Sequence, residues 1–190
     1  MNLPFPLILA SKSPRRQQLL RDLGYSFEVR TMDVPEDYPE DLDKESVARY
    51  LAEKKARAFQ PHLQPGEVVL TADTTVVLNN ELLEKAADAK EACTMLSKLS
   101  GQAHFVITGV CLASQDQLKS FDELTEVHFK TLSEAEIDYY IEHYQPFDKA
   151  GAYGIQEWIG MVGVEKLVGS YYNVVGLPVH RVHAALQHWA

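Results

Sequence analysis

The chain has 190 residues, enough for one substantial hydrophobic core, and its 46% hydrophobic and 24% charged residues are ordinary for a soluble globular protein. No stretch approaches the roughly 20 apolar residues of a membrane span, so we expect no membrane partner. The formal net charge of −9 argues against nucleic acid polymers, which need many cationic contacts, but is compatible with a small anionic ligand held by local cations.

The chain opens with an apolar run at residues 7–10 that leads directly into a helix signal. Ser13 suits the N-cap, Pro14 suits the first helical position, and an apolar stripe follows. Backbone N–H groups at a helix N-terminus favour anions, and Arg15 and Arg16 add planar donors that bind phosphate oxygens in pairs. This turn is therefore a candidate phosphate site; the alternative is that paired arginines at a helix start are solvated surface.

Strands and helices then alternate along the chain. In chain order we expect a strand at 27–31, a loop at 34–43, a helix at 46–59, a loop at 60–66, a strand at 68–78, a helix at 89–99, strands at 104–113 and 124–131, a helix from Ser133 through His143, a strand at 161–168 and a final helix from Pro178. A capping box of Ser133 and Glu136 marks one of these helix starts. The interleaving predicts α/β architecture.

A carboxylate interrupts the apolar strand predicted at 68–78. Asp73 is costly there unless it meets a metal, a cation or hydrogen-bond donors. Open α/β sheets bind ligands at the carboxyl ends of their strands, whereas the structural alternative is an aspartate that caps a bend. Magnesium needs hard oxygen ligands, which Asp73 and Glu36 could supply together.

The segment 148–156 combines two glycines with small residues, the composition of a loop that lets backbone approach a ligand closely. Gln156 offers a donor and an acceptor, which suits the edge of a nucleobase. The alternative is a tight connection between a helix and a strand. Lys55 and Lys85, taken singly, fit solvated surface as well as a binding site.

Several familiar catalytic and metal-binding patterns are absent from the sequence. Cys93 and Cys111 lie in unrelated segments, so we expect buried thiols in a reducing cytoplasm rather than a zinc ribbon or a redox pair. His180 and His183 are three apart without the adjacent glutamate of a zincin, and we expect them on the solvent side of the last helix. The phosphate-loop, dinucleotide-binding and nucleophile-elbow motifs are missing too.

Taken together and in order, the motifs resemble those of the Maf family of nucleoside triphosphate pyrophosphatases. The resemblance spans almost the whole chain, and five ordered matches are far more specific than any one of them. The matching segments are 9–16 (Leu-Ala-Ser-Lys-Ser-Pro-Arg-Arg), 72–74 (Ala-Asp-Thr), 99–101 with His104 and 108–110, 150–156, and 175–178.

The resemblance implies a single domain over residues 1–190, with an elongated mixed sheet, flanking helices and two lobes around a central cleft. It implies hydrolysis of dTTP and UTP at the α–β phosphoanhydride, with a divalent cation, Mg²⁺ or Mn²⁺, as cofactor. By matching position, Asp73 is the acid/base residue or a metal ligand. The other implied site residues are the metal-binding Glu36 and the substrate-binding Ser11, Ser13, Arg15, Arg16, Lys55, Thr74, Lys85 and Gln156.

Two departures from the family pattern leave substrate preference open. Ala86 and Ala87 follow Lys85 where a Lys-Pro pair is common, and Glu157 and Trp158 follow Gln156 where a glycine is usual. The alternatives are a pyrophosphatase that prefers 7-methyl-GTP, a phosphatase that releases orthophosphate, and a non-enzymatic nucleotide sensor that regulates septum formation. Removal of noncanonical nucleotides or restraint of cell division is the implied role, and a homodimer is the commonest assembly to expect.

Overall fold

The structure, a computed structural model, describes residues 1–189. Its contacts divide the chain into two compact units. Unit 1 comprises Met1–Asp73, Thr108–Glu123 and Gly176–Ala190, and unit 2 comprises Thr74–Ile107 and Leu124–Val175. The boundaries between the units fall inside the three long strands β3 (Val68–Leu78), β5 (Ala103–Ala113) and β6 (Leu118–Phe129).

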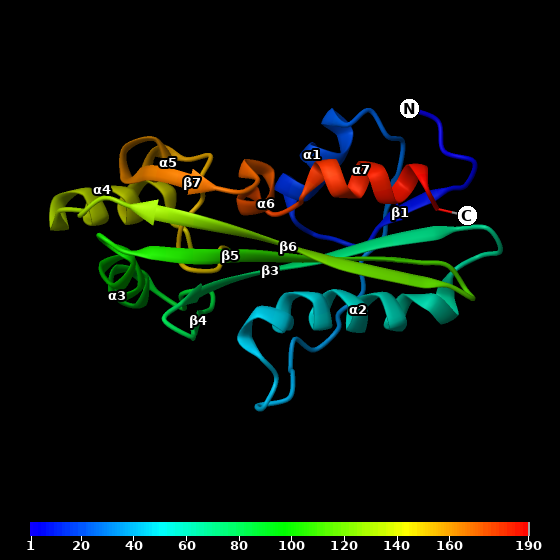
Figure 1. Ribbon diagram of the computed structural model, residues 1–190, viewed down its shortest axis with the longest axis horizontal. Coiled ribbons are helices and arrows are strands. Elements are labelled where there is room, and N and C mark those ends of the chain that lie inside the picture. Colours follow the sequence, from blue (N-terminus) through cyan, green and yellow to red (C-terminus); the bar gives the residue numbers. More distant parts are fainter. Residues whose placement is uncertain (190) are drawn as a thin grey trace. The chain divides into compact units, whose positions relative to one another are not determined.

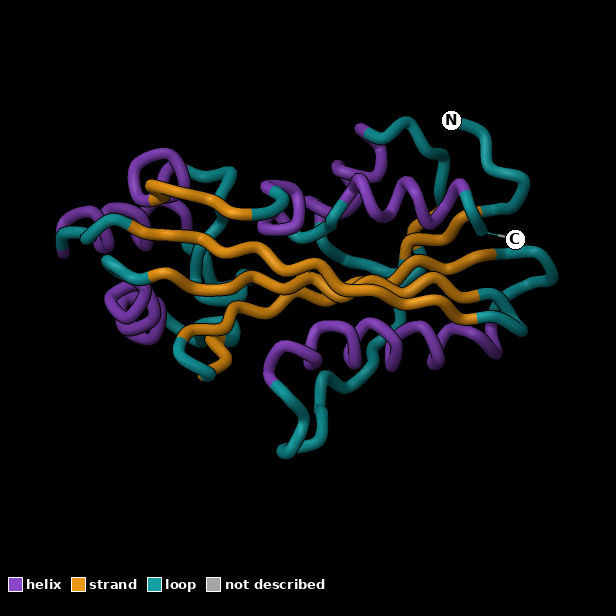
Figure 2. Tube along the Cα trace, viewed as in Figure 1, coloured by secondary structure: helices purple, strands orange, loops and turns teal. Residues whose placement is uncertain are grey.

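The strands form one mixed sheet in the order β2-β1-β3-β5-β6-β7, with β4 paired to β3 (Figure 2). Strand β1 is parallel to β2 and β3, whereas β4 and β7 are antiparallel to β3 and β6. The predicted mixed α/β fold is confirmed. The remaining elements are β1 (Leu7–Leu9), β2 (Glu28–Val29), β4 (Glu81–Leu83), β7 (Val164–Val168), α1 (Pro14–Asp22), α2 (Val47–Phe59), α3 (Ala89–Leu99), α4 (Glu134–Tyr144), α5 (Trp158–Gly163), α6 (Tyr171–Val175), α7 (Val179–Gln187) and the 3-10 turns η1 (Lys44–Ser46) and η2 (Gln60–His62).

In unit 1, α2 lies along one face of the strands, and α1 and α7 lie along the other (Figure 1). Small residues let α2 approach closely: Ala52 and Ala56 are fully buried in a core cluster with residues of β1, β3 and β5. Gly109 of β5 is the tightest point, because a Cβ there would lie 2.3 Å from Arg49 N and 2.4 Å from Ala48 O. Only glycine therefore allows α2 to cross β5 at this distance.

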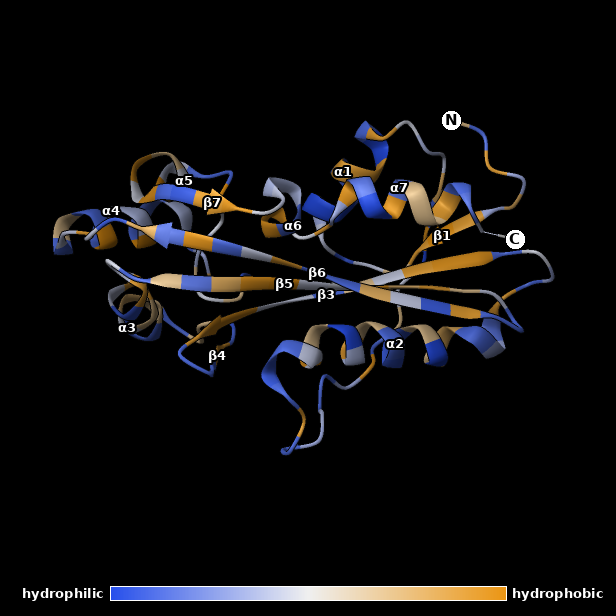
Figure 3. Cartoon of the chain, viewed as in Figure 1, coloured by the Kyte–Doolittle hydropathy of each residue, from blue (hydrophilic) through white to orange (hydrophobic). Residues whose placement is uncertain are grey.

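Unit 2 has its own hydrophobic core, in which α3 and α4 contact each other. Fully buried Leu96 and Leu99 of α3 belong to the same cluster as Tyr140 of α4 and Ile159 of α5. Figure 3 shows how hydrophobic residues of α3 and α4 alternate with polar ones, the pattern of helices with one buried face.

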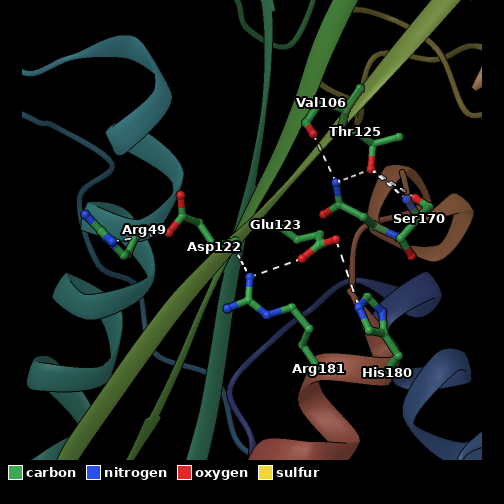
Figure 4. A network of polar contacts seen from close by, with 9 residues as sticks. Arg49, Val106, Asp122, Glu123, Thr125, Ser170, His180 and Arg181 are labelled. Carbon is green, nitrogen blue, oxygen red and sulfur yellow. Dashed lines mark hydrogen bonds and ion pairs between the residues drawn. The ribbon is translucent and has the colours of Figure 1, made fainter. Parts of the chain in front are cut away.

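A buried asparagine fastens α6 to two strands within unit 2. Asn173 is 0% exposed, and its Nδ2 donates to Val106 O at 3.0 Å and to Thr125 Oγ1 at 2.9 Å. Thr125 also exchanges hydrogen bonds with the backbone of Ser170, as Figure 4 shows. Buried polar groups must be satisfied, and here one side chain joins α6 to β5 and β6.

Charged side chains join β6 to the helices of unit 1 (Figure 4). Arg181 of α7 lies 3.1 Å from Glu123 Oε2, and Arg49 of α2 lies 3.2 Å from Asp122 Oδ1. Because these side chains are partly exposed, the pairs help to define the docking of the two helices more than they contribute to stability.

Several local predictions differ from the structure, and the strand predicted at 27–31 is limited to Glu28–Val29. Residues 161–163, predicted as strand, belong to α5, and the predicted loop at 60–66 begins with the 3-10 turn η2. The predicted strand at 124–131 begins earlier, at Leu118, and ends earlier, at Phe129. His183 is half-buried with its Nδ1 2.7 Å from the Tyr25 hydroxyl, so its predicted place on the solvent side of α7 is wrong.

The predicted long strand at 68–78 and helix at 89–99 are confirmed at both ends. Cys111 is buried as expected, and burial raises the pKa of its thiol to about 12, whereas Cys93 is half-buried. Both cysteines are free. None of the helices within residues 1–189 combines the length and the apolar composition that a membrane span requires.

Candidate functional site

The turn between β1 and α1 is built by serine side chains. Ser13 is the N-cap of α1 in an extended conformation, and its hydroxyl accepts from Arg16 N at 3.4 Å. The buried Ser11 hydroxyl accepts from Ser13 N at 3.2 Å, which fixes the preceding residue as well. The predicted helix start is therefore confirmed, and Arg15 and Arg16 lie in the first helical turn of α1.

Arg16 ties α1 to the strand that carries the candidate carboxylate. Its Nε donates to Gly176 O at 2.8 Å, and its NH1 donates to Ala72 O at 2.9 Å. Burial lowers the pKa of Arg16, and the neighbouring Asp73 opposes this shift. Arg16 therefore has a structural task that the sequence did not predict: it fixes α1 against the residue that directly precedes Asp73.

Asp73 lies just beyond the carboxyl end of β1. Pairing between β1 and β3 ends at Leu9 and Leu70, and Ala10 N donates to Leu70 O at 2.9 Å before the chain leaves the sheet. Strand β3 continues past this point, and Asp73 follows within three residues, with a side chain 14% exposed. The structure places it inside the strand rather than at a capping bend, and at the edge where α/β sheets bind ligands.

Lys55 of α2 is shared by two carboxylates. Its Nζ lies 2.6 Å from Asp73 Oδ1 and 2.7 Å from Glu36 Oε1, and its side chain is 18% exposed. The hydroxyl of Thr71 donates to Ala52 O at 2.7 Å, one turn before Lys55, and so holds α2 against β3 at this level. The sequence alone could not distinguish Lys55 from a solvated surface lysine, but the structure holds it against Asp73 of β3.

The acidic loop that carries Glu36 is fastened to α2 by a second lysine. Lys54 Nζ donates to Asp37 O at 2.9 Å and to Asp37 Oδ1 at 2.7 Å. Two consecutive lysines of α2 therefore hold the loop: Lys54 binds the side chain and the backbone carbonyl of Asp37, and Lys55 binds the side chain of Glu36. Lys54 was not predicted from the sequence. Its only signal there is the adjacent Lys55, and the loop that both lysines contact becomes known only from the fold.

The charges of this group influence one another. Asp73 and Glu36 act to raise the pKa of Arg16, whereas Arg15 acts to lower it. Two carboxylates, one ammonium and two guanidiniums are therefore gathered at the carboxyl end of β1. Such a group combines a proton acceptor with cations that can stabilise an anionic ligand.

The donor set for a cation consists of two carboxylates. No cluster of three or more His, Cys, Asp or Glu side chains suited to a metal occurs among residues 1–189. Glu36 and Asp73 nevertheless fit the way proteins hold Mg²⁺, which takes one or two carboxylates and fills its other positions with water and substrate phosphate. The ammonium of Lys55 contacts one oxygen of each, which shows that both can face the same small positive group.

In unit 2, the loop predicted at 148–156 is fastened to Lys85. The backbones of Lys85 and Ala150 form an antiparallel bridge, and Gly151 N donates to Leu83 O and Glu84 O, each at 3.0 Å. A Cβ at Gly151 would lie 3.1 Å from the Val76 side chain, and its φ of 68° favours glycine. The chain is then buried through Ile155, and Gln156 is the first exposed residue.

His104, which belongs to a matching segment, is a core residue. It is 1% exposed, and its Nε2 lies 2.7 Å from the Tyr153 hydroxyl. Burial lowers the pKa of His104 to about 4, so the ring is neutral near pH 7. The presence of His104 in the motif is explained by its contact with Tyr153, which lies within the loop at 148–156.

The predicted site residues form two groups, one in each unit. The unit 1 group lies around the carboxyl end of β1: Ser11, Ser13, Arg15, Arg16, Glu36, Lys55 and Asp73. The unit 2 group contains the half-buried Thr74 of β3 and the exposed Lys85 and Gln156.

Comparison with known proteins gives matches over nearly the whole chain. The family described as Maf-like protein matches residues 6–189. The chain is 47% identical over 184 residues to a dTTP/UTP pyrophosphatase of Bacteroides thetaiotaomicron, covering 96% of this chain and 95% of the relative. It is 49% identical to a protein of the same name from Phocaeicola vulgatus, with the same coverage.

A solved structure shares the fold at low sequence identity. It is the nucleoside-triphosphatase / dITP/XTP pyrophosphatase of Mycobacterium abscessus, which matches with a TM-score of 0.51 at 15% identity. The match covers 96% of this chain and 93% of that protein. At this identity the likeness concerns the fold alone.

Proposed function

The chain belongs to the Maf family, and on that premise we propose that it hydrolyses dTTP and UTP at the α–β phosphoanhydride, releasing the nucleoside monophosphate and pyrophosphate. The observation that carries the proposal is the Lys55 ammonium held between Asp73 and Glu36, 2.6 and 2.7 Å from their carboxylates. Both carboxylates also interact electrostatically with Arg16. A sensor that only binds nucleotides would not need a carboxylate that is held by a lysine and placed to accept a proton from water.

In the proposed reaction, the oxygen of a water molecule forms a bond to the α-phosphorus. The bond between that phosphorus and the bridging oxygen breaks, and pyrophosphate leaves with the electron pair. Asp73 accepts the proton that the water gives up, and Lys55 keeps the carboxylate in place. Arg15 and Lys55 stabilise the charge on the phosphates, since such reactions depend mostly on positioning and electrostatics.

A divalent cation, Mg²⁺ or Mn²⁺, would be held by Asp73 and Glu36, the two oxygen donors that meet at Lys55. When bound, it would neutralise phosphate charge. Lys55 would then exchange part of its contact with these carboxylates for contact with phosphate.

The remaining expectations stay proposals for this chain. Arg15, Thr74 and Gln156 take part in substrate choice, and Lys85 binds phosphate. Ser11 and Ser13 shape the turn that receives the anion, as their hydrogen bonds in the N-cap suggest. The protein acts in the cytoplasm, on small nucleotides rather than on nucleic acid, and as a homodimer.

Product analysis tests the proposal. The purified chain is incubated with dTTP, UTP, CTP, GTP and 7-methyl-GTP, with Mg²⁺ or Mn²⁺, and the phosphorus products are identified by NMR. We expect pyrophosphate and monophosphate, fastest from dTTP and UTP. Orthophosphate with a diphosphate would contradict the bond assignment, preference for 7-methyl-GTP would overturn the substrate assignment, and binding without turnover would support the sensor.

A further inference from the structure

An ion pair between the buried Lys149 and the half-buried Glu157 joins the start of the loop at 148–156 to the residue that directly follows it. The Lys149 side chain is only 9% exposed, and its Nζ lies 3.0 Å from Glu157 Oε1 and 2.8 Å from Asp148 Oδ1. The other oxygen of Glu157 accepts a hydrogen bond from the Tyr140 hydroxyl. Both carboxylate oxygens of Glu157 are therefore fixed from inside unit 2.

The same network includes the backbone below Gln156. The Tyr140 hydroxyl accepts from Gly154 N at 3.0 Å, and Glu157 N donates to Gly154 O at 3.0 Å. Burial, followed by the hydrogen bond to Glu157, raises the pKa of Tyr140, so the hydroxyl remains a donor. Glu157 is also the N-cap of α5, but its side chain makes no capping hydrogen bond. Its carboxylate is committed to the loop instead.

The carboxylate of Glu157 and the amide nitrogen of Gln156 approach the same point. A Cβ built on Gly154 would lie 2.8 Å from Gln156 Nε2, 2.9 Å from Glu157 Cδ and 3.0 Å from Glu157 Oε2. Gln156 Nε2 and the Glu157 carboxylate therefore both lie against Gly154, and the amide oxygen Oε1 is not among the three atoms nearest to that point. A negative charge attracts an amide N–H group and repels a carbonyl oxygen, so the carboxylate favours the orientation in which the nitrogen is the nearer end of the amide.

We propose that Glu157 is a positioning residue for substrate choice: its charge orients the Gln156 amide so that the carbonyl oxygen faces the base. An outward carbonyl accepts a hydrogen bond from a ring N–H. Uracil and thymine carry such a donor at N3, whereas cytosine has an acceptor there. The proposal deepens and rests on the proposed function, because Gln156 reads the base only if the nucleotide binds.

The test compares UTP with CTP, whose rings differ at N3 and at the neighbouring exocyclic group. Steady-state kinetics are measured for the wild type and Glu157→Gln, together with binding of the α,β-methylene analogues of both nucleotides. For Glu157→Gln we expect the UTP:CTP ratio of kcat/KM to fall by about tenfold, mainly through KM, because the amide is free to turn over. Glu157→Asp, which retains the charge, is expected to recover part of the ratio.

Two control variants and a stability measurement separate positioning from loss of structure. Glu136→Gln removes one charge from an ion pair elsewhere in unit 2, where Lys130 Nζ lies 2.6 Å away, and should leave the ratio unchanged. The double variant Lys149→Met/Glu157→Gln removes both charges of the ion pair. Its free energy of unfolding should differ from that of Glu157→Gln, whereas its UTP:CTP ratio of kcat/KM should stay as low. Thermal unfolding of each variant shows which of them fold.

The outcomes distinguish this inference from the proposed function. If Glu157→Gln keeps the wild-type UTP:CTP ratio within about twofold in both kinetics and analogue binding, or if the wild type does not distinguish the two nucleotides, the inference is overturned although hydrolysis stands. If the wild type hydrolyses neither nucleotide, the proposed function fails. The analogue binding ratios still decide whether Glu157 sets the preference for the base.

Discussion

Replacement of Gly109 by alanine should separate α2 from the strands and so disturb the site from a distance. The added Cβ would lie 2.3–2.4 Å from backbone atoms of Ala48 and Arg49, whereas ordinary contacts begin at 3.4 Å. Helix α2 must therefore withdraw by about 1 Å, since a backbone cannot move aside as a flexible side chain can. Lys55 lies on that helix, and its 2.6 Å contact with Asp73 would leave the normal hydrogen-bond range.

The expected cost of Gly109→Ala follows from overpacking of a closely packed interface. Such changes destabilise by about 1–3 kcal/mol, and a clash with helix backbone belongs at the upper end, so we expect a loss of about 3 kcal/mol in the free energy of unfolding. For a chain of this length that corresponds to a fall in Tm of roughly 10 °C. Urea denaturation gives the free energy, and pyrophosphate release from UTP gives the accompanying loss of kcat.

A second glycine provides the control for Gly109→Ala. At Gly163 the nearest atom to an added Cβ is the Leu132 side chain, 3.2 Å away, which can shift. Gly163→Ala should therefore change the free energy of unfolding by less than about 1 kcal/mol and leave kcat unchanged. A Gly109→Ala protein as stable and as active as the wild type would refute the close crossing of α2 and β5, and with it this account of how Lys55 reaches Asp73.

Three further substitutions test separate parts of the structure. Lys55→Met removes the ammonium between two carboxylates, and we expect kcat for UTP to fall by about 100-fold in steady-state assays. Arg16→Lys keeps the charge but not the planar fork that reaches Gly176 O and Ala72 O, and urea denaturation should show a loss of about 2 kcal/mol. Burial lowers the pKa of His104 from 6.5 to about 4, so its ring is neutral in the folded protein near pH 7. Because the unfolded chain takes up the proton more readily, the free energy of unfolding should fall by about 3 kcal/mol as the pH drops from 6.5 to 4. His104→Gln should lack this loss.

Neighbouring residues supply the controls for these substitutions. Arg57→Met on α2 and Arg21→Lys on α1 change exposed side chains, so neither kcat nor unfolding stability should change by more than a small amount. Equal effects of Lys55→Met and Arg57→Met, or of Arg16→Lys and Arg21→Lys, would contradict the assigned contacts. A wild-type stability that stays flat between pH 6.5 and 4 would show that His104 is not buried as described.

Local sequence signals predicted the elements that have a regular pattern. The strand at 68–78 and the helix at 89–99 were predictable at both ends because an apolar run and an apolar stripe continue without interruption. The Ser13 cap and the following proline located α1 in the same way. The short elements failed for the opposite reason: α6 has five residues and α5 six, too few for a period to show.

The site was predictable as a set of candidates but not as an arrangement. Asp73 could be selected from the sequence because a charge inside an apolar strand demands a partner. Its actual partner, Lys55, could not, because the contact depends on the approach of α2 over Gly109 and on the Thr71 hydrogen bond to Ala52. The pairing of Lys149 with Glu157 depends likewise on how the loop folds back on itself.

The Asp73 carboxylate is proposed to accept the proton of the attacking water, and Asp73→Asn tests this role most directly. Asparagine has the same shape and can still accept a hydrogen bond from Lys55, so circular dichroism and Tm should remain close to the wild type. Pyrophosphate release from UTP, measured with excess enzyme to detect a single turnover, should fall by about 1,000-fold or more. Release at more than about one tenth of the wild-type rate from the folded variant would contradict the account.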